Sequence, residues 1–122
     1  APDGSGETAL LAASRNGHRQ VAEMLLDLGA DPDVASVRTG ETPLHLACRR
    51  GDQHLSSLLL AAVQDMERVD KEGLNALARA GRSGHVELEG RLRNQTVLLK
   101  ERRGEALTEA EAELSRALRR PQ

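Results

Sequence analysis

The chain contains no phenylalanine, tyrosine or tryptophan among its 122 residues. Aromatic side chains usually supply the largest buried areas in protein cores, so leucine, valine, alanine and methionine must build this core alone. Each buried large aliphatic side chain contributes about 1.5 to 3 kcal/mol, and stability is therefore expected to rest on many small increments. The chain also lacks the tyrosine and tryptophan anchors that dominate many protein interfaces.

Cysteine is almost absent as well. The single Cys48 excludes an intramolecular disulfide framework and a zinc site built on several cysteines, and it favours a reducing compartment, the cytosol or the nucleus. The longest apolar run, residues 58–63, is far shorter than the roughly 20 residues that a membrane span requires. We expect no membrane association.

The chain has no excess of basic residues, because its formal net charge is −2. This balance gives no reason to expect direct binding of nucleic acid. The chain begins without an initiator methionine and without the charged and apolar regions of a signal peptide. We therefore expect it to be cut from within a longer polypeptide.

A pattern of glycine, leucine and alanine returns along the chain, first after 34 residues and then after 33. Such a period is typical of stacked supersecondary units, each of which buries its apolar face against a neighbour. Function is therefore expected on a surface and not in an enclosed pocket. The first copy has Gly6, Thr8, Leu10, Ala13, Gly17 and Leu25, the second has Gly40, Thr42, Leu44, Ala47, Gly51 and Leu59, and the third has Gly73, Leu77, Ala80, Gly84 and Leu92.

The middle copy predicts the structure of one unit. Thr42 before Pro43 is a helix start, because the threonine oxygen can accept an unpaired backbone N–H and proline suits the first helical position. Gly51 is placed to end that helix, and a second apolar pattern at residues 55–62 follows almost at once. The charged connection after it ends in the turn sequence Asp-Lys-Glu-Gly at residues 70–73.

These residues carry a family resemblance. Residues 40–47 read Gly-Glu-Thr-Pro-Leu-His-Leu-Ala, and Gly51 and three leucines at 58–60 follow them. This pattern resembles the ankyrin repeat, and residues 6–10 together with 25–31 resemble another copy of it. The resemblance implies an all-α fold, an ankyrin-repeat solenoid of about three helix-turn-helix repeats. The residues that follow the repeats lie outside the resemblance and predict a C-terminal helical extension.

The third copy departs from the family pattern. Asn75 replaces the capping threonine, Ala78 replaces the histidine, and Gly90 with Arg91 is expected to interrupt the second helix. We expect an ankyrin repeat domain over residues 1–93 and a helical C-terminal cap or extension over residues 94–122. The three repeats are expected at about residues 3–35, 36–69 and 70–93.

Two paths are open for the chain after the third repeat. Its last helix either runs on to a stop at Gly104, or breaks near Asn94 and Gln95, and the break is the favoured expectation. Thr108 and Glu111 then form a capping box before a final helix with a thin apolar stripe. We expect this helix to pack back over the last repeat as a cap. The alternatives are a partner-binding helix or a linker.

Four histidines and one cysteine are the candidate reactive groups. His18 and His85 follow equivalent glycines, and the family resemblance gives His45 a structural role, bonding the threonine cap. His54 stands outside the pattern and has no second ligand at zinc spacing. Cys48 occupies a small-residue position and is expected to be buried and unreactive. We expect no catalytic site, no metal site and no cofactor.

Partner contacts are expected at the loop tips and at the solvent-facing ends of the first helices. Arg15, Arg49 and Arg82 share one repeat position and would form a column, joined by Arg50 and Arg79, with repeats about 10 Å apart. Arginines at helix ends also favour the negative end of the helix dipole and need no ligand to explain them. The loop-tip positions follow from the family resemblance. The predicted partner-binding residues are Arg15, Asn16, Arg38, Glu41, Arg49, Arg50, Lys71, Glu72, Leu74 and Arg82.

These observations predict a non-catalytic protein-interaction module, a scaffold or adaptor. Because the arginine fork matches carboxylate and phosphate oxygens, the expected partner is an acidic protein or peptide segment bound on the concave face. The alternative is a regulatory or targeting domain of a larger enzyme, such as a kinase or a ubiquitin ligase. A module that masks a basic segment is disfavoured, because the predicted inner face is basic.

Overall fold

The computed structural model describes residues 8–119. Over that range the chain forms seven α-helices and no β-strand, as the all-α expectation requires. The helices are α1 (Ala9–Arg15), α2 (Arg19–Asp27), α3 (Pro43–Arg50), α4 (Gln53–Ala62), α5 (Ala76–Arg82), α6 (Val86–Arg103) and α7 (Glu109–Arg119).

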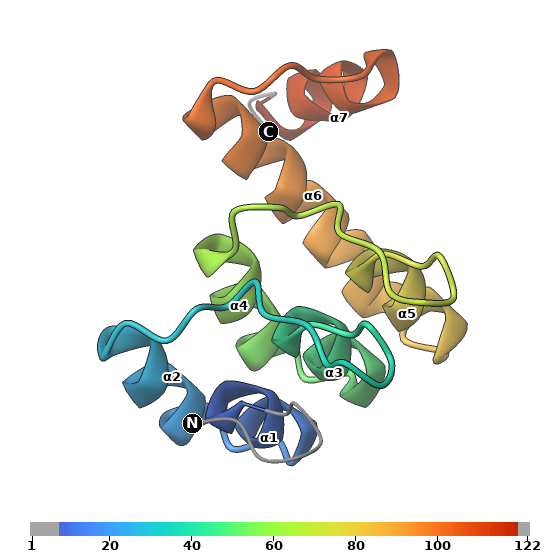
Figure 1. The fold of residues 1–122 in the computed structure, drawn as a ribbon. Coiled ribbons are helices and arrows are strands. Elements are labelled where there is room, and N and C mark those ends of the chain that lie inside the picture. Colours follow the sequence, from blue (N-terminus) through green and yellow to red (C-terminus); the bar gives the residue numbers. More distant parts are fainter. Residues whose placement is uncertain (1–7, 120–122) are drawn as a thin grey trace.

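The first six helices form three antiparallel pairs that stack side by side (Figure 1). Helices α1, α3 and α5 lie in one row, which we call the inner row, and α2, α4 and α6 lie in a second, outer row. Each pair packs against its neighbour in both rows. The predicted solenoid of about three helix-turn-helix repeats is confirmed.

Each inner helix begins at a side chain that accepts a backbone N–H. Thr8 accepts the Leu11 N–H at 3.1 Å, Thr42 accepts the His45 N–H at 3.3 Å, and Asn75 accepts the Ala78 N–H at 2.8 Å. Asparagine caps a helix as well as threonine does, so the substitution in the third repeat costs nothing in structure. The predicted helix start at Thr42 is confirmed.

Aliphatic side chains fill the space between the two rows. The equivalent alanines Ala13, Ala47 and Ala80 are buried in the inner row, where small side chains let neighbouring helices approach closely. Cys48 lies in the same core and is fully buried. The leucines of this core are Leu10, Leu44, Leu55, Leu59, Leu60, Leu88 and Leu92.

His45 joins the second repeat to the third. Its Nε2 lies 2.8 Å from the Leu74 carbonyl oxygen, to which it donates, and its Nδ1 lies 2.8 Å from the Thr42 hydroxyl. The expected contact with the threonine cap is therefore confirmed. Burial disfavours the charged ring and lowers the pKa of His45, although the Leu74 carbonyl opposes the shift.

The outer helix of the third repeat is continuous, so the predicted break near Asn94 and Gln95 is wrong. Gln95 faces α4 and donates to the Ser57 carbonyl at 3.0 Å, which holds the helix where the break was expected. The predicted interruption at Gly90 and Arg91 is also wrong, because Arg91 points to solvent. The helix ends at Gly104 in the left-handed conformation, with φ +76°.

The far end of α6 holds the C-terminus of α4. Arg103 donates to the Val63 carbonyl at 2.7 Å, and its guanidinium also reaches the carbonyls of Ala61 and Gln64 at 3.4 Å. A cation at a helix C-terminus meets the negative end of the dipole and pairs with carbonyls that have no partner within the helix. This contact accounts for a helix end at Val63 without a glycine stop.

The last helix, α7, packs against α6 (Figure 1). The predicted capping box is confirmed, since Glu111 accepts the Thr108 N–H at 3.0 Å and Thr108 accepts the Glu111 N–H at 3.2 Å. Glu111 also pairs with Lys100 of α6 at 2.9 Å. The cover over the last repeat is partial, because Leu77 and Ala78 remain half-exposed beside a depression of about 470 Å³.

Acidification is expected to destabilise the fold through His45. Its folded pKa lies below the unfolded value of 6.5, so the unfolded chain binds more protons as the pH falls from 7.5 to 5.5. The melting temperature should be lower at pH 5.5, and His45→Gln should reduce this difference. The exposed His54→Gln serves as control, and an unchanged pH difference in His45→Gln would contradict the assignment.

Removal of the Arg103 contact is expected to weaken the link between the second and third repeats. Arg103→Ala should lower the free energy of unfolding by about 1 to 2 kcal/mol, because three helix-end carbonyls lose their cation. The neighbouring Arg102 is exposed, and Arg102→Ala should cost less than about 0.5 kcal/mol in urea denaturation. Equal losses in the two variants would refute the capping role.

Candidate partner-binding surface

The three predicted column arginines lie at the C-terminal ends of the inner helices. Arg15 ends α1, Arg49 is the penultimate residue of α3, and Arg82 ends α5. All three side chains are exposed, and the three helices are neighbours in the inner row. We call the side formed by the inner row and the two long connecting loops the inner face, which is the predicted concave side.

Glu41 lies beneath this face and not on it. Its side chain is only 2% exposed, and its Oε2 lies 2.7 Å from Arg49 Nη2 and 3.9 Å from Arg79 Nε. The expectation that Glu41 is itself a partner contact does not fit this burial. The carboxylate instead fixes the position of Arg49, whose side chain remains 48% exposed above it.

An ion pair whose two partners are both buried lies one repeat further on. Arg79 donates to Asp70 Oδ2 at 2.7 Å, and Glu72 lies 3.5 Å away. The hydrogen bond to Asp70 raises the pKa of Arg79. Burial alone would raise the pKa of Asp70. Its hydrogen bonds from Arg79 and from the backbone N–H groups of Leu74 and Glu72 outweigh this effect, so the pKa of Asp70 is lowered. Arg79 occupies the repeat position of the buried Leu46, and this was the one signal in the sequence that could have indicated a buried pair.

The loop that carries Arg38 is a closed turn. The Ser36 N–H bonds the Glu41 carbonyl at 2.8 Å, and the Gly40 N–H bonds the Ser36 carbonyl at 2.7 Å. Gly40 adopts φ +74°, which favours glycine, and the Lys71 N–H of the next loop bonds the Thr39 carbonyl at 3.0 Å. These bonds present Arg38 on a fixed backbone.

Three arginines surround a small hollow at the junction of the first two repeats. Arg15 comes from α1, Arg49 from α3 and Arg38 from the loop between α2 and α3, and the hollow measures about 240 Å³. We call it the arginine notch. Its other lining residues are Ser36, Thr39, Glu41 and Leu46.

Other predicted contact residues have local roles. Asn16 donates to the Ala12 carbonyl at 2.9 Å, and Leu74 is half-buried and supplies the carbonyl that His45 bonds. Arg50 donates to the Arg15 carbonyl at 3.2 Å and lies against Gly17, so it ties two helix ends together and does not extend the column. Lys71 and Glu72 are exposed at the second loop tip, as expected.

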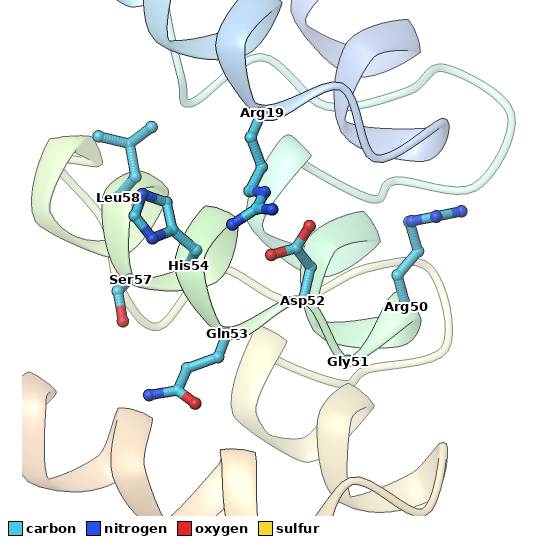
Figure 2. A pocket seen from close by; sticks show the side chains of 8 residues that line it. All are labelled: Arg19, Arg50, Gly51, Asp52, Gln53, His54, Ser57 and Leu58. Atoms are coloured by element: carbon cyan, nitrogen blue, oxygen red, sulfur yellow. The ribbon is translucent and has the colours of Figure 1, made fainter.

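A wider depression of about 910 Å³ lies along the helix turns, away from the notch. Figure 2 shows Arg19 of α2 pointing toward Asp52 and His54 of the next repeat. Asp52 caps α4 by accepting the Leu55 N–H at 3.0 Å. This depression therefore has mixed charge, and its acidic group is committed to the fold.

The histidine and cysteine side chains that could carry chemistry either make structural contacts or lie apart from one another. His85 lies 3.0 Å from the Arg49 carbonyl and links two repeats. Across residues 8–119, no three His, Cys, Asp or Glu side chains gather as a metal site would require. Nor does that part of the chain contain a helix whose length and apolar character suit a membrane crossing.

The stacked helix pairs show that this is a helical-repeat protein, and two protein-family profiles identify the kind of repeat. A profile described as "Ankyrin repeats (3 copies)" matches residues 32–92, and one described as "Ankyrin repeat" matches residues 5–36. The chain therefore belongs to the ankyrin-repeat family. Ankyrin repeats are protein–protein interaction modules and are generally non-catalytic.

Several curated proteins share this segment. Glycerophosphocholine phosphodiesterase gde1 of Schizosaccharomyces pombe is 35% identical over 96 residues, which cover 79% of this chain and 8% of that protein. Protein phosphatase 1 regulatory subunit 12A of Mus musculus is 34% identical over 99 residues, which cover 81% of this chain and 10% of that protein. Inactive serine/threonine-protein kinase TEX14 of Mus musculus is 37% identical over 79 residues, which cover 65% of this chain and 5% of that protein. The matched segment thus spans a tenth or less of each of these three relatives.

Cys48 is expected to be inert in the folded protein. Burial raises the pKa of its thiol to about 12, against an ordinary value of 9.0, so very little of the reactive thiolate is present at pH 8. Dithiobis(nitrobenzoate) should modify Cys48 quickly in guanidinium chloride and far more slowly in buffer. Rapid, complete modification of the native protein would contradict the burial of this side chain.

Proposed function

We propose that this chain is a recognition module that binds an acidic segment of a partner protein along its inner face. The observation that carries the proposal is the exposure of Arg15, Arg49 and Arg82 at the ends of three adjacent helices. The single thiol favours a module that works in the cytosol or the nucleus.

The charges of the inner face support an acidic partner. Besides the three arginines of the column, Arg38 and Lys71 are exposed at the loop tips, and Glu72 is the acidic neighbour of Lys71. Guanidinium groups bind carboxylates through two parallel hydrogen bonds, which gives both direction and strength. Because no aromatic residue is available on this chain, the arginines supply the anchors and the partner supplies any aromatic contact.

A second candidate function is that of a regulatory or targeting domain within a larger enzyme, such as a kinase or a ubiquitin ligase. The observation that favours it is the short span of the match, since the relatives include a phosphodiesterase and an inactive kinase many times longer. The two candidates are compatible, because the inner face would then bind a regulated partner or another part of the same chain. The reading frame around this sequence in its transcript decides between them.

Charge reversal on the inner face is expected to weaken acidic-peptide binding. Arg49 is unsuitable for reversal, because a glutamate there would face the buried Glu41. Arg38→Glu combined with Arg82→Glu changes exposed side chains only, and should weaken binding of a labelled ten-residue glutamate-rich peptide at least tenfold by fluorescence anisotropy. The melting temperature should hardly change.

The matched control carries the same charge change elsewhere. Arg19→Glu combined with Arg102→Glu reverses two exposed arginines that lie outside the inner face. This control should keep most of the peptide affinity and the salt dependence of the unmodified protein. Equal weakening in both double variants would show that net charge, and not the inner face, governs binding.

A further inference from the structure

We infer that a groove beside α5, at the end of the stack, binds one amphipathic helix of a partner protein, with an aliphatic stripe and basic flanks. The groove is the depression of about 470 Å³ that α5, α6 and α7 surround, and we call it the terminal groove. Among the described residues that line it, none belongs to the predicted partner-binding set. The inference therefore goes beyond the proposed function and concerns a second surface, with a partner of opposite charge.

The repeat register favours a helix at this place. Leu77 of α5 stands at the repeat position of Leu44 in α3. Ala78, the next residue, stands at the position of His45. Because α5 packs against α3, the two residues of the second repeat are only 2% and 1% exposed. The two residues of the third repeat are half-exposed, since no further helix of the inner row follows α5 within residues 8–119. The end of the stack therefore presents apolar surface that a neighbouring helix covers in the second repeat.

The open surface suits a single helix better than another whole repeat. In the second repeat, His45 donates to the Leu74 carbonyl at 2.8 Å and so ties down the loop of the next repeat. Ala78 has no side-chain donor with which to form an equivalent bond. The outer helix of the third repeat, α6, already packs against α7. The terminal groove therefore leaves room beside the inner helix alone.

The last helix, α7, adds a second apolar wall. It packs on α6 through a polar side, because the buried residue of Glu109–Arg119 is Ser115, which donates to Glu101. The apolar stripe predicted for this helix remains accessible, since Ala110 and Ala117 are exposed and Leu118 is 39% exposed. Ala110 lines the groove together with the apolar residues of α5, and the wall of the groove is more apolar than polar.

Ion pairs hold the groove in shape before a partner arrives. Lys100 of α6 lies 2.9 Å from Glu111 of α7 and 3.1 Å from Glu67, in the loop before α5. Glu101 of α6 also pairs with Arg119 of α7. These contacts connect the segments that surround the groove. Groups that are positioned before binding lose less conformational entropy when the partner binds.

The charges of the groove favour a basic partner. Its lining has three carboxylates and two cations, which leaves a formal charge of −1: Glu67, Glu89, Glu111, Arg93 and Lys100. Both cations are already paired, because Lys100 has two carboxylate partners and Arg93 lies 3.6 Å from Glu89. The side chain of Glu67 is 62% exposed at the rim. Lysine or arginine beside the aliphatic stripe of a partner helix matches this excess, whereas acidic flanks are repelled.

The acidic character continues along α7. Glu113 is exposed one turn after Ala110 and one turn before Ala117, so it borders the apolar stripe. The inner face carries exposed arginines instead. The two surfaces therefore select partners of opposite charge.

The probe is a synthetic peptide of about 18 residues, long enough to form a helix, with leucine and alanine at helical spacing and lysine on both flanks. A scrambled peptide of the same composition lacks the stripe, and a third peptide has glutamate in place of lysine. Binding of the labelled peptides to the whole chain is measured by fluorescence anisotropy. The lysine-flanked peptide should bind at least tenfold more tightly than either control peptide.

Two substitutions fill the groove from different helices. Ala78→Gln and Ala110→Gln each add a larger polar side chain, and each should weaken binding of the lysine-flanked peptide at least fivefold. Ala61→Gln makes the same change at an exposed alanine of α4 outside the groove, and should leave the affinity unchanged. Because Ala110 lies on α7, outside the repeats, Ala110→Gln carries the test even where Ala78→Gln fails to fold.

The inference is overturned by failure of the lysine-flanked peptide to bind, by equal affinity for the scrambled peptide, or by tighter binding of the glutamate-flanked peptide. Unchanged affinity in the folded groove variants would overturn it as well. A concentration-dependent dimer in sedimentation equilibrium, lost in Ala110→Gln, would assign the groove to a second copy of the chain and also overturn it. Arg38→Glu combined with Arg82→Glu should not weaken binding of the lysine-flanked peptide, so the two proposals are tested separately.

Discussion

Burial of leucine and alanine between neighbouring helix pairs is the interaction on which this structure depends. A single repeat cannot bury its own apolar surface, and a comparison of equivalent positions in two repeats shows this. Leu55 of the second repeat is fully buried, whereas Val21, at the same position of the first repeat, is 46% exposed at the end of the stack. Because the chain has no aromatic side chains, small and aliphatic residues between the stacked helix pairs form the core. The same stacking brings the ends of α1, α3 and α5 to one edge.

Buried polar contacts fix how the pairs are oriented. Contacts between leucine side chains are non-directional and do not fix the orientation of one helix pair on the next. By contrast, His45 bonds one carbonyl of the next repeat, and Arg103 bonds the last carbonyls of α4. The pair of Arg79 and Asp70 holds the second loop against α5 in the same way. These groups are costly to bury unless each finds its partner, so they specify one packing arrangement in a core that alone would permit several.

The repeat units could be predicted from the sequence because their signals are local. Thr42 and Gly51 start and end a helix by their own hydrogen bonds and backbone preference, and the structure confirms both. The failures concern residues whose role is set by distant neighbours. Gln95 stays helical because α4 offers the Ser57 carbonyl, and Glu41 is buried because two arginines surround it. The arginine notch joins residues from two repeats and a loop, and the period aligned Arg15 with Arg49 without placing Arg38 beside them.

The stack gathers basic side chains that lie far apart in the sequence on one face, and the proposed function depends on that arrangement. Backbone amide NMR of the labelled protein, with the glutamate-rich peptide added, tests this most directly. The account predicts that the shifted signals cluster on the inner face, around Arg38, Lys71 and Arg82. Shifts concentrated instead around Arg19 and His54, in the depression along the helix turns, would contradict it.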